Sequence, residues 1–175
     1  KIQNLEFIDK FAGIVKTIVS TDTAEGRVIT KSFPASCRLN LEECESGRYK
    51  DLCPDSSKRS VLYLEDKGIR FIQRIGPKTT WRASLDLVCW LNLPKLGVTN
   101  CSYSANAISQ IIKKFPVVPF ASGIYHKIQI NIVGQQSKAV NPFQKYSFTE
   151  ETTQYLMSPF DYFVLQLEVE FEIDQ

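Results

Sequence analysis

An alternation of apolar and polar side chains within residues 161–174, held for about a dozen residues, constrains the fold more than any other feature of the sequence. The apolar members of this stretch are Phe163, Leu165, Leu167, Val169, Phe171 and Ile173. The polar residues between them are Gln166, Glu168, Glu170 and Glu172. A period of two places the apolar side chains on one face of a strand and the carboxylates on the other. At ~3.3 Å per residue such a strand reaches roughly 40 Å. We predict a long strand with one buried face.

Two further stretches, residues 81–93 and 124–133, repeat this alternation. Long alternating strands are typical of antiparallel sheets with one packed face. Shorter strands are predicted at residues 27–33, 61–65 and 69–75. Turn residues separate the last two of these strands from each other and from the stretch that follows. The predicted turns are Asp66-Lys67-Gly68 and Gly76-Pro77-Lys78, in which glycine accepts a positive φ.

Two segments, residues 4–19 and 102–115, carry apolar residues at helical spacing. A third, shorter helix is predicted at residues 149–157, where Thr149 serves as the N-cap. Two amphipathic helices suffice to cover one face of the sheet. The sequence therefore predicts one α+β domain spanning residues 1–175. It is a two-layer sandwich, a mainly antiparallel sheet with long strands covered on one face by two amphipathic helices.

Composition narrows the function classes. The formal net charge is only +2, too small to indicate a nucleic-acid or membrane partner. No apolar run reaches the length of a membrane span, and Glu6, Asp9 and Lys10 interrupt any signal-peptide core. We expect no membrane association. The chain has five cysteines without CxxC spacing, and we expect reduced thiols.

No motif of known chemistry is found. The sequence lacks G-x-S-x-G, G-x-G-x-x-G and the phosphate-loop pattern. The single histidine, His126, falls within a predicted strand, on its apolar side, where a partly buried structural histidine is the common case. A zinc site built from Cys37, Cys44 and Cys53 would need a fourth ligand. We predict no catalytic activity, no metal and no cofactor; an enzyme that uses His126 is the least favoured alternative.

Two charged surfaces suggest partners. The glutamate row of the last strand is predicted to be solvated or to meet a basic partner. We expect this strand at a sheet edge, beside Arg70, Arg74 and Arg82, so that complementary charges meet between subunits. Alternatively, these arginines, with Lys78, Lys127 and Tyr125, form a basic face of the kind that binds single-stranded nucleic acid.

Two long polar loops, residues 40–59 and 134–147, are predicted to be interaction segments. Connections of this length are uncommon in compact domains and are usually functional. Both contain apolar or aromatic groups that solvated linkers seldom carry, and segments of this kind often order on a partner. We expect them at subunit or partner interfaces. The candidate interface residues are Arg48, Tyr49, Leu52, Phe143 and Tyr146.

The order of elements resembles that of the neck and tail-completion proteins of tailed bacteriophages. The segment Tyr155-Leu156-Met157-Ser158-Pro159-Phe160-Asp161-Tyr162-Phe163, leading into a long alternating strand, is similar to the end of such proteins. Residues 44–54 and 88–96 are similar to proteins of crAss-like phages of Bacteroidetes.

This resemblance implies a non-enzymatic head-tail connector or tail-completion protein in the virion neck or tail. It implies a homo-oligomeric ring of six- or twelve-fold symmetry, assembled in the bacterial host cytoplasm. The implied partners are other neck, portal or tail proteins, and DNA passing through the lumen without sequence-specific contact. The alternative is a stand-alone ligand- or nucleic-acid-binding α+β module.

Overall fold

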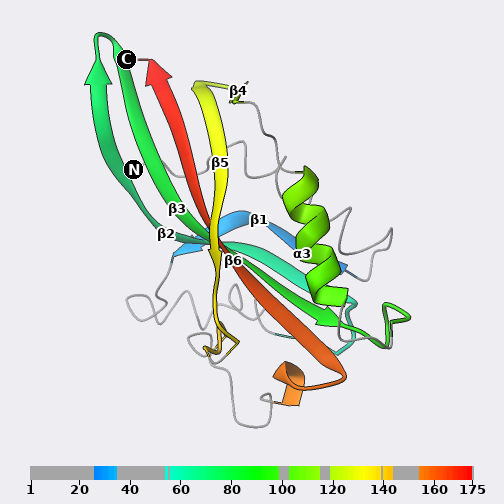
Figure 1. Cartoon of the computed structure of the whole chain (residues 1–175). Coiled ribbons are helices and arrows are strands. Elements are labelled where there is room, and N and C mark those ends of the chain that lie inside the picture. Colours follow the sequence, from blue (N-terminus) through cyan, green and yellow to red (C-terminus); the bar gives the residue numbers. More distant parts are fainter. Residues whose placement is uncertain are drawn as a thin grey trace.

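Six strands form one sheet in the order β1-β2-β3-β6-β5-β4 (Figure 1). The computed structural model describes residues 26–34, 54, 56–98, 103–114, 119–138, 140–143 and 154–174. Along this part of the chain the elements are β1 (Gly26–Pro34), β2 (Ser60–Ile75), β3 (Lys78–Asn92), α3 (Tyr103–Lys114), β4 (Phe120–Ser122), β5 (Tyr125–Gln135) and β6 (Phe160–Asp174). The fold is dominated by a mainly antiparallel sheet, with β1 and β2 as a parallel pair.

The predicted long strands are confirmed, but the last one lies inside the sheet. β6 pairs with β3 without interruption from Lys78↔Asp174 to Asn92↔Phe160, and it pairs with β5 on its other side. The expectation that β6 forms a sheet edge is therefore wrong. The physical reason is that an interior place provides both rows of backbone donors and acceptors on this long strand with partners.

The predicted turn at Asp66-Lys67-Gly68 is also wrong. β2 continues through these residues as a single strand, and the register with β3 shifts between Asp66 and Gly68. Gly68 adopts φ 117°, and its N–H donates to Asp66 Oδ1 at 2.8 Å. The turn signal thus produces a β-bulge, which uses the same residue types as a turn. The chain reverses at Gly76-Pro77, as predicted, where Gly76 has φ 61°.

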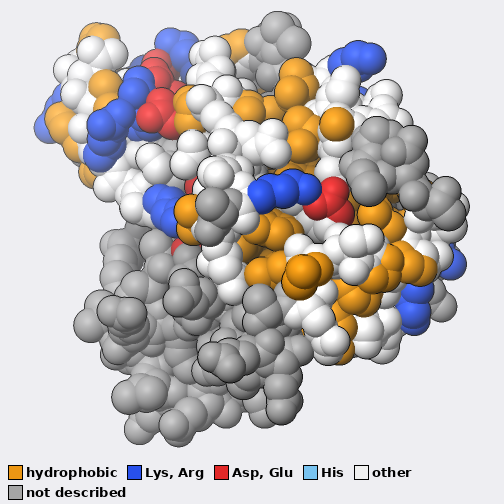
Figure 2. All heavy atoms as spheres, turned by 60° about the horizontal axis from the view of Figure 1, so that its bottom comes forward, with side chains coloured by type: hydrophobic (Ala, Val, Ile, Leu, Met, Phe, Trp, Pro, Cys, Tyr) orange, Lys and Arg blue, Asp and Glu red, His pale blue; other side chains and the backbone are white. Residues whose placement is uncertain are grey.

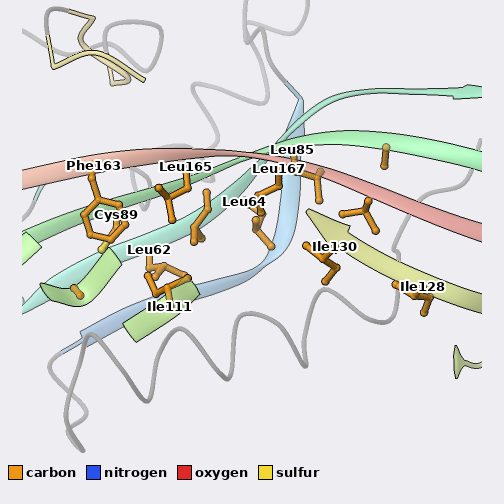
Figure 3. Packing of buried hydrophobic residues seen from close by; sticks show 14 of the residues in the cluster. Leu62, Leu64, Leu85, Cys89, Ile111, Ile128, Ile130, Phe163, Leu165 and Leu167 are labelled. Atoms are coloured by element: carbon orange, nitrogen blue, oxygen red, sulfur yellow. The ribbon is translucent and has the colours of Figure 1, made fainter. Parts of the chain in front are cut away.

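One face of the sheet packs against α3. This helix contributes Ala107 and Ile111, and Ile111 is fully buried (Figure 3). The hydroxyl of Ser104 donates to the Asp161 carboxylate, which ties the first turn of α3 to β6. Lys113 and Lys114 occupy the last turn, where cations suit the helix dipole. The main core on this face includes Leu62, Leu64, Leu87, Cys89, Phe163, Leu165, Leu167, Val169 and Phe171.

The opposite face is buried as well, but only at one end of the sheet. A second core there contains Val61, Tyr63, Val88, Trp90, Phe143, Tyr162 and Val164. Trp90 Nε1 donates to the carbonyl of Tyr155 at 2.6 Å, and its ring stacks on Phe160 with centroids 5.3 Å apart. The prediction of one buried face is therefore wrong for this half. A strand buried on both faces reads as a continuous apolar run, and residues 87–91 form such a run.

The second covering helix predicted at residues 4–19 lies outside the described residues, as does most of loop 40–59. Among the described residues α3 is the one α-helix, as predicted for residues 102–115. Of the helix predicted at residues 149–157, the structure describes a single 3₁₀ turn at residues 154–156.

Candidate interaction surface

The sheet has two halves of different character, which we call proximal and distal. The proximal half comprises residues 60–66, 85–92 and 160–167. The distal half comprises residues 67–84, 125–132 and 168–174, and it ends at the β2–β3 turn (Figure 1). In the distal half the face opposite the main core carries charged side chains (Figure 2). We call this the charged face.

Arginines of β2 and β3 form ion pairs with glutamates of β6 on the charged face. Arg82 of β3 lies directly opposite Glu170 of β6, and Arg82 Nη2 lies 2.9 Å from Glu170 Oε2. The other nitrogen, Nη1, lies 3.5 Å from Glu168 Oε2. Arg70 of β2 reaches the same Glu168 at 3.8 Å. On the far side of β6, Lys127 Nζ lies 2.9 Å from Glu172 Oε1.

These pairs mean that the glutamate row meets basic groups of its own sheet. The expected role of the row, to attract basic groups of a neighbouring subunit, is therefore not supported. Partly exposed ion pairs contribute only ~0–1 kcal/mol each to stability. The main effect of these pairs is therefore to favour this strand register and to leave fewer unpaired charges on the face.

A pair of buried carboxylates lies where the charged face meets the second core. Glu65 and Asp86 are directly opposite each other in β2 and β3, and only 1% and 7% of their surfaces are exposed. Lys67 Nζ lies 3.5 Å from Glu65 and 3.0 Å from Asp86. A cation shared between adjacent carboxylates offsets their repulsion and their desolvation. Within the described residues, no group of three or more His, Cys, Asp or Glu could hold a metal ion.

His126 lies at the distal end of β5 and is half-exposed. Its Nε2 is 3.4 Å from Asp174 Oδ2. Lys127 has φ 48°, and the β5–β6 register shifts between His126 and Gln129. This irregularity changes which side chains face the core: Tyr125 is buried, whereas Ile124 is 63% exposed. The prediction that Ile124 and His126 lie on the buried side of this strand is therefore wrong. His126 faces a carboxylate rather than the core.

Cys89 is a free, fully buried thiol in the main core. Burial, with a smaller contribution from Asp161, raises the pKa of this thiol well above its usual value. A neutral buried thiol is unreactive, so Cys89 is a packing residue. The candidate zinc ligands Cys37, Cys44 and Cys53 lie outside the described residues.

The candidate interface residues separate into two groups. Arg48, Tyr49, Leu52 and Tyr146 lie outside the described residues. Phe143 is fully buried in the second core, with its ring centroid 6.3 Å from that of Tyr63. Its backbone N–H donates to Asn141 Oδ1 at 2.8 Å. This part of loop 134–147 thus packs on the chain's own core, whereas we expected it at a subunit or partner interface.

β2 and β5 extend beyond the short outer strands β1 and β4, so part of each has no outer neighbour among the described residues. β1 pairs with β2 only as far as Pro34↔Asp66, which leaves residues 67–75 unpaired on that side. β4 pairs with β5 only at Tyr125 and Ile128, which leaves residues 129–135 without a described partner on the side away from β6. Unpaired strand edges are templates for pairing with another chain.

Exposed apolar residues accompany both edges. Phe71 is 52% exposed and Ile75 is 68% exposed on β2, and Val133 is 57% exposed on β5. Our reading of the sequence did not assign these residues to an interface. The available signal was that Ile72 and Val133 interrupt the alternation of polar and apolar residues in their strands.

No protein-family model matches the chain, and no curated protein matches it significantly. No helix in the described part of the chain is long and apolar enough to cross a membrane.

Proposed function

We propose that this chain is a structural virion protein that forms a homo-oligomeric ring in the neck or tail of a tailed bacteriophage, between portal and tail. The observation that carries the ring is a pair of strand edges, on opposite sides of one sheet, that have no strand partner among the residues that the structure describes. A subunit with a different free edge on each side joins its neighbours head to tail, and such contacts close into a ring when the rotation fits. The phage assignment rests on the resemblance in element order and in residues 155–163.

The described charges support a structural rather than a catalytic role. Arg82 and Lys67 each hold two carboxylates, and His126 faces Asp174 at the end of the sheet. These contacts tie strands to one another. We accordingly propose no enzymatic activity.

The proposal includes the expectations that the resemblance brings. The ring has six- or twelve-fold symmetry and is assembled in the host cytoplasm. Its partners are other neck, portal or tail proteins, and DNA crosses its lumen without sequence-specific contact. Arg48, Tyr49, Leu52 and Tyr146 remain candidate interface residues. We also propose that residues 4–19 form the second helix that covers the sheet.

A single-stranded nucleic-acid-binding module is the second candidate, and one observation favours it. At the β2–β3 turn, Arg74 and Lys78 make no ion pair with a described residue, and Phe71 is exposed nearby. Cations beside an exposed aromatic ring suit a single strand. The candidate is weaker because Arg70, Arg82 and Lys127 are already paired with glutamates.

Native mass spectrometry of the purified chain, followed by electron microscopy, tests the ring. The expected result is one closed oligomer, with six or twelve copies as the resemblance implies. A monomer at every concentration tested, together with salt-sensitive binding of a labelled oligonucleotide, would favour the second candidate. Deleting residues 44–56 tests the loop separately: we expect unchanged circular dichroism and lost assembly. Assembly with unchanged stoichiometry would show that this loop is only a linker.

A further inference from the structure

We infer that neighbouring copies join by adding the distal edge of β2 in one copy to the edge of β5 that has no described strand partner in the next, which extends the sheet from subunit to subunit. This inference rests on the proposed ring and names its contact. The segments are Gly68–Phe71 of β2 and Gln129–Ile132 of β5. Each is a stretch of four residues in regular register with its inner neighbour, bounded by register shifts.

The two segments lie at the same level of the sheet. Cross-strand pairing gives three complete lines of residues that run from edge to edge. These lines are Gly68–Ser84–Glu168–Asn131, Ile69–Ala83–Val169–Ile130 and Arg70–Arg82–Glu170–Gln129. A neighbour can therefore pair line to line without any step along the strands. Such pairing adds each neighbour by rotation about an axis along the strands, and repeated contacts of this kind close into a ring when the rotation fits.

Strand direction agrees with this junction. β2 is antiparallel to β3, β3 to β6, and β6 to β5. It follows that β2 and β5 run in opposite directions within one subunit. A copy rotated about an axis along the strands keeps its direction, so β2 of one copy meets β5 of the next as an antiparallel pair.

The junction also continues the core face and the charged face of the sheet from one copy to the next. Line-to-line pairing places Ile69 beside Ile130 of the next copy, on the face of the main core, to which both belong. It places Arg70 beside Gln129 on the charged face. A slip of one residue would move an apolar side chain to the charged face and is therefore disfavoured. Pairing β2 with another β2 would instead bring Arg70 and Arg74 toward the same cations of the partner, which like-charge repulsion opposes.

Neighbouring strands limit the junction to this region. β1 ends at Pro34, which lies opposite Asp66 and has no N–H to continue a ladder. β4 ends its pairing at Ile128. The exposed Phe71 is the last residue of the β2 segment, and the exposed Val133 follows directly after the β5 segment, at its register shift.

Lysine substitutions on each edge provide the first test, because an added charge blocks edge pairing. Phe71→Lys blocks the β2 edge, and Val133→Lys blocks the β5 edge. The matched control is Ile112→Lys on α3, whose side chain is as exposed as that of Phe71, at 52%. We expect each edge variant to be monomeric by native mass spectrometry and the control to assemble like the unmodified chain. An equimolar mixture of the two edge variants retains one intact junction, so it should give a one-to-one dimer and nothing larger.

Disulfide trapping provides a second test that does not depend on disruption. In the double variant Arg70→Cys with Gln129→Cys, the new cysteines face each other across the inferred junction. Directly opposed residues of antiparallel strands have Cβ atoms close to the separation that a disulfide needs. Mild oxidation should yield a covalent ladder up to the full ring on a non-reducing gel, whereas either single variant should yield none.

The outcomes separate the two proposals. If the unmodified chain assembles but both edge variants assemble equally well and no ladder forms, the ring stands and the edge junction is wrong. The same holds if only one edge variant dissociates or if the mixture forms full rings. If the unmodified chain is monomeric and no ladder forms, both the ring and the junction fail.

Discussion

Replacing Phe143 by alanine tests whether the second loop belongs to the chain's own core. The Phe143 side chain is 0% exposed, so the whole ring is removed from a packed site. It also makes two edge-to-face contacts, with centroids 6.3 Å from Tyr63 and 6.5 Å from Tyr162. Phe→Ala in a core costs ~3–5 kcal/mol, and each aromatic contact adds about 0.5–1.5 kcal/mol beyond burial. We expect a loss near the upper end, about 4–5 kcal/mol, a large share of the ~5–15 kcal/mol that stabilises a typical domain.

Urea unfolding followed by tryptophan fluorescence measures this loss, because Trp90 lies in the same core. The control is Val140→Ala, three positions away, whose side chain is 50% exposed; it should change stability by less than ~0.5 kcal/mol. All variants are compared at one subunit concentration, since assembly would add to apparent stability. Equal effects at the two positions would refute the packing. A Phe143→Ala chain that keeps its unfolding midpoint but loses its oligomer would place Phe143 at an interface instead.

Two further predictions concern the sheet and its thiol. Leu167→Ala should lower the free energy of unfolding by ~2–5 kcal/mol because Leu167 is only 2% exposed. Glu168→Gln should lower it by under ~1 kcal/mol because the ion pairs of Glu168 are partly exposed. Similar urea midpoints for the two variants would show that the buried and exposed faces of β6 are misassigned. Burial raises the pKa of Cys89, so the folded state holds a proton that the unfolded state loses above about pH 8.5. Stability should therefore fall as pH rises above that value, by at most ~1.4 kcal/mol per pH unit from this group. The Cys89→Ala variant, less stable at neutral pH, should show a shallower fall between pH 8.5 and 10; an identical slope would exclude Cys89 as the cause.

Local sequence patterns were sufficient to predict the elements whose conformation depends on nearby residues alone. The alternation in residues 161–174 predicts β6 because burying one face of a strand needs only a period of two. Gly76-Pro77 predicts the β2–β3 turn, and Pro116 with the apolar spacing of residues 102–115 predicts α3. In each case the residue types alone determine the backbone conformation.

Tertiary structure decided what depends on neighbours distant in sequence. Asp66-Lys67-Gly68 forms a bulge rather than a turn because the strand on both sides of it pairs with β3, a partner that local preference does not include. Lys127 shifts the phase of β5, and Tyr125 rather than Ile124 enters the core. These outcomes depend on the register with another strand.

The same limit applies to the interaction surface. The sequence shows that Glu168 and Glu170 are on one face, but only cross-strand register reveals that Arg82 forms ion pairs with both. The composition of loop 134–147 suggests a partner, yet Phe143 fills a space between Tyr63 and Tyr162 that exists only after β2 and β6 join the sheet. Periodicity thus determined which residues form strands, and the order of strands decided which of their edges and charges find partners within the described sheet.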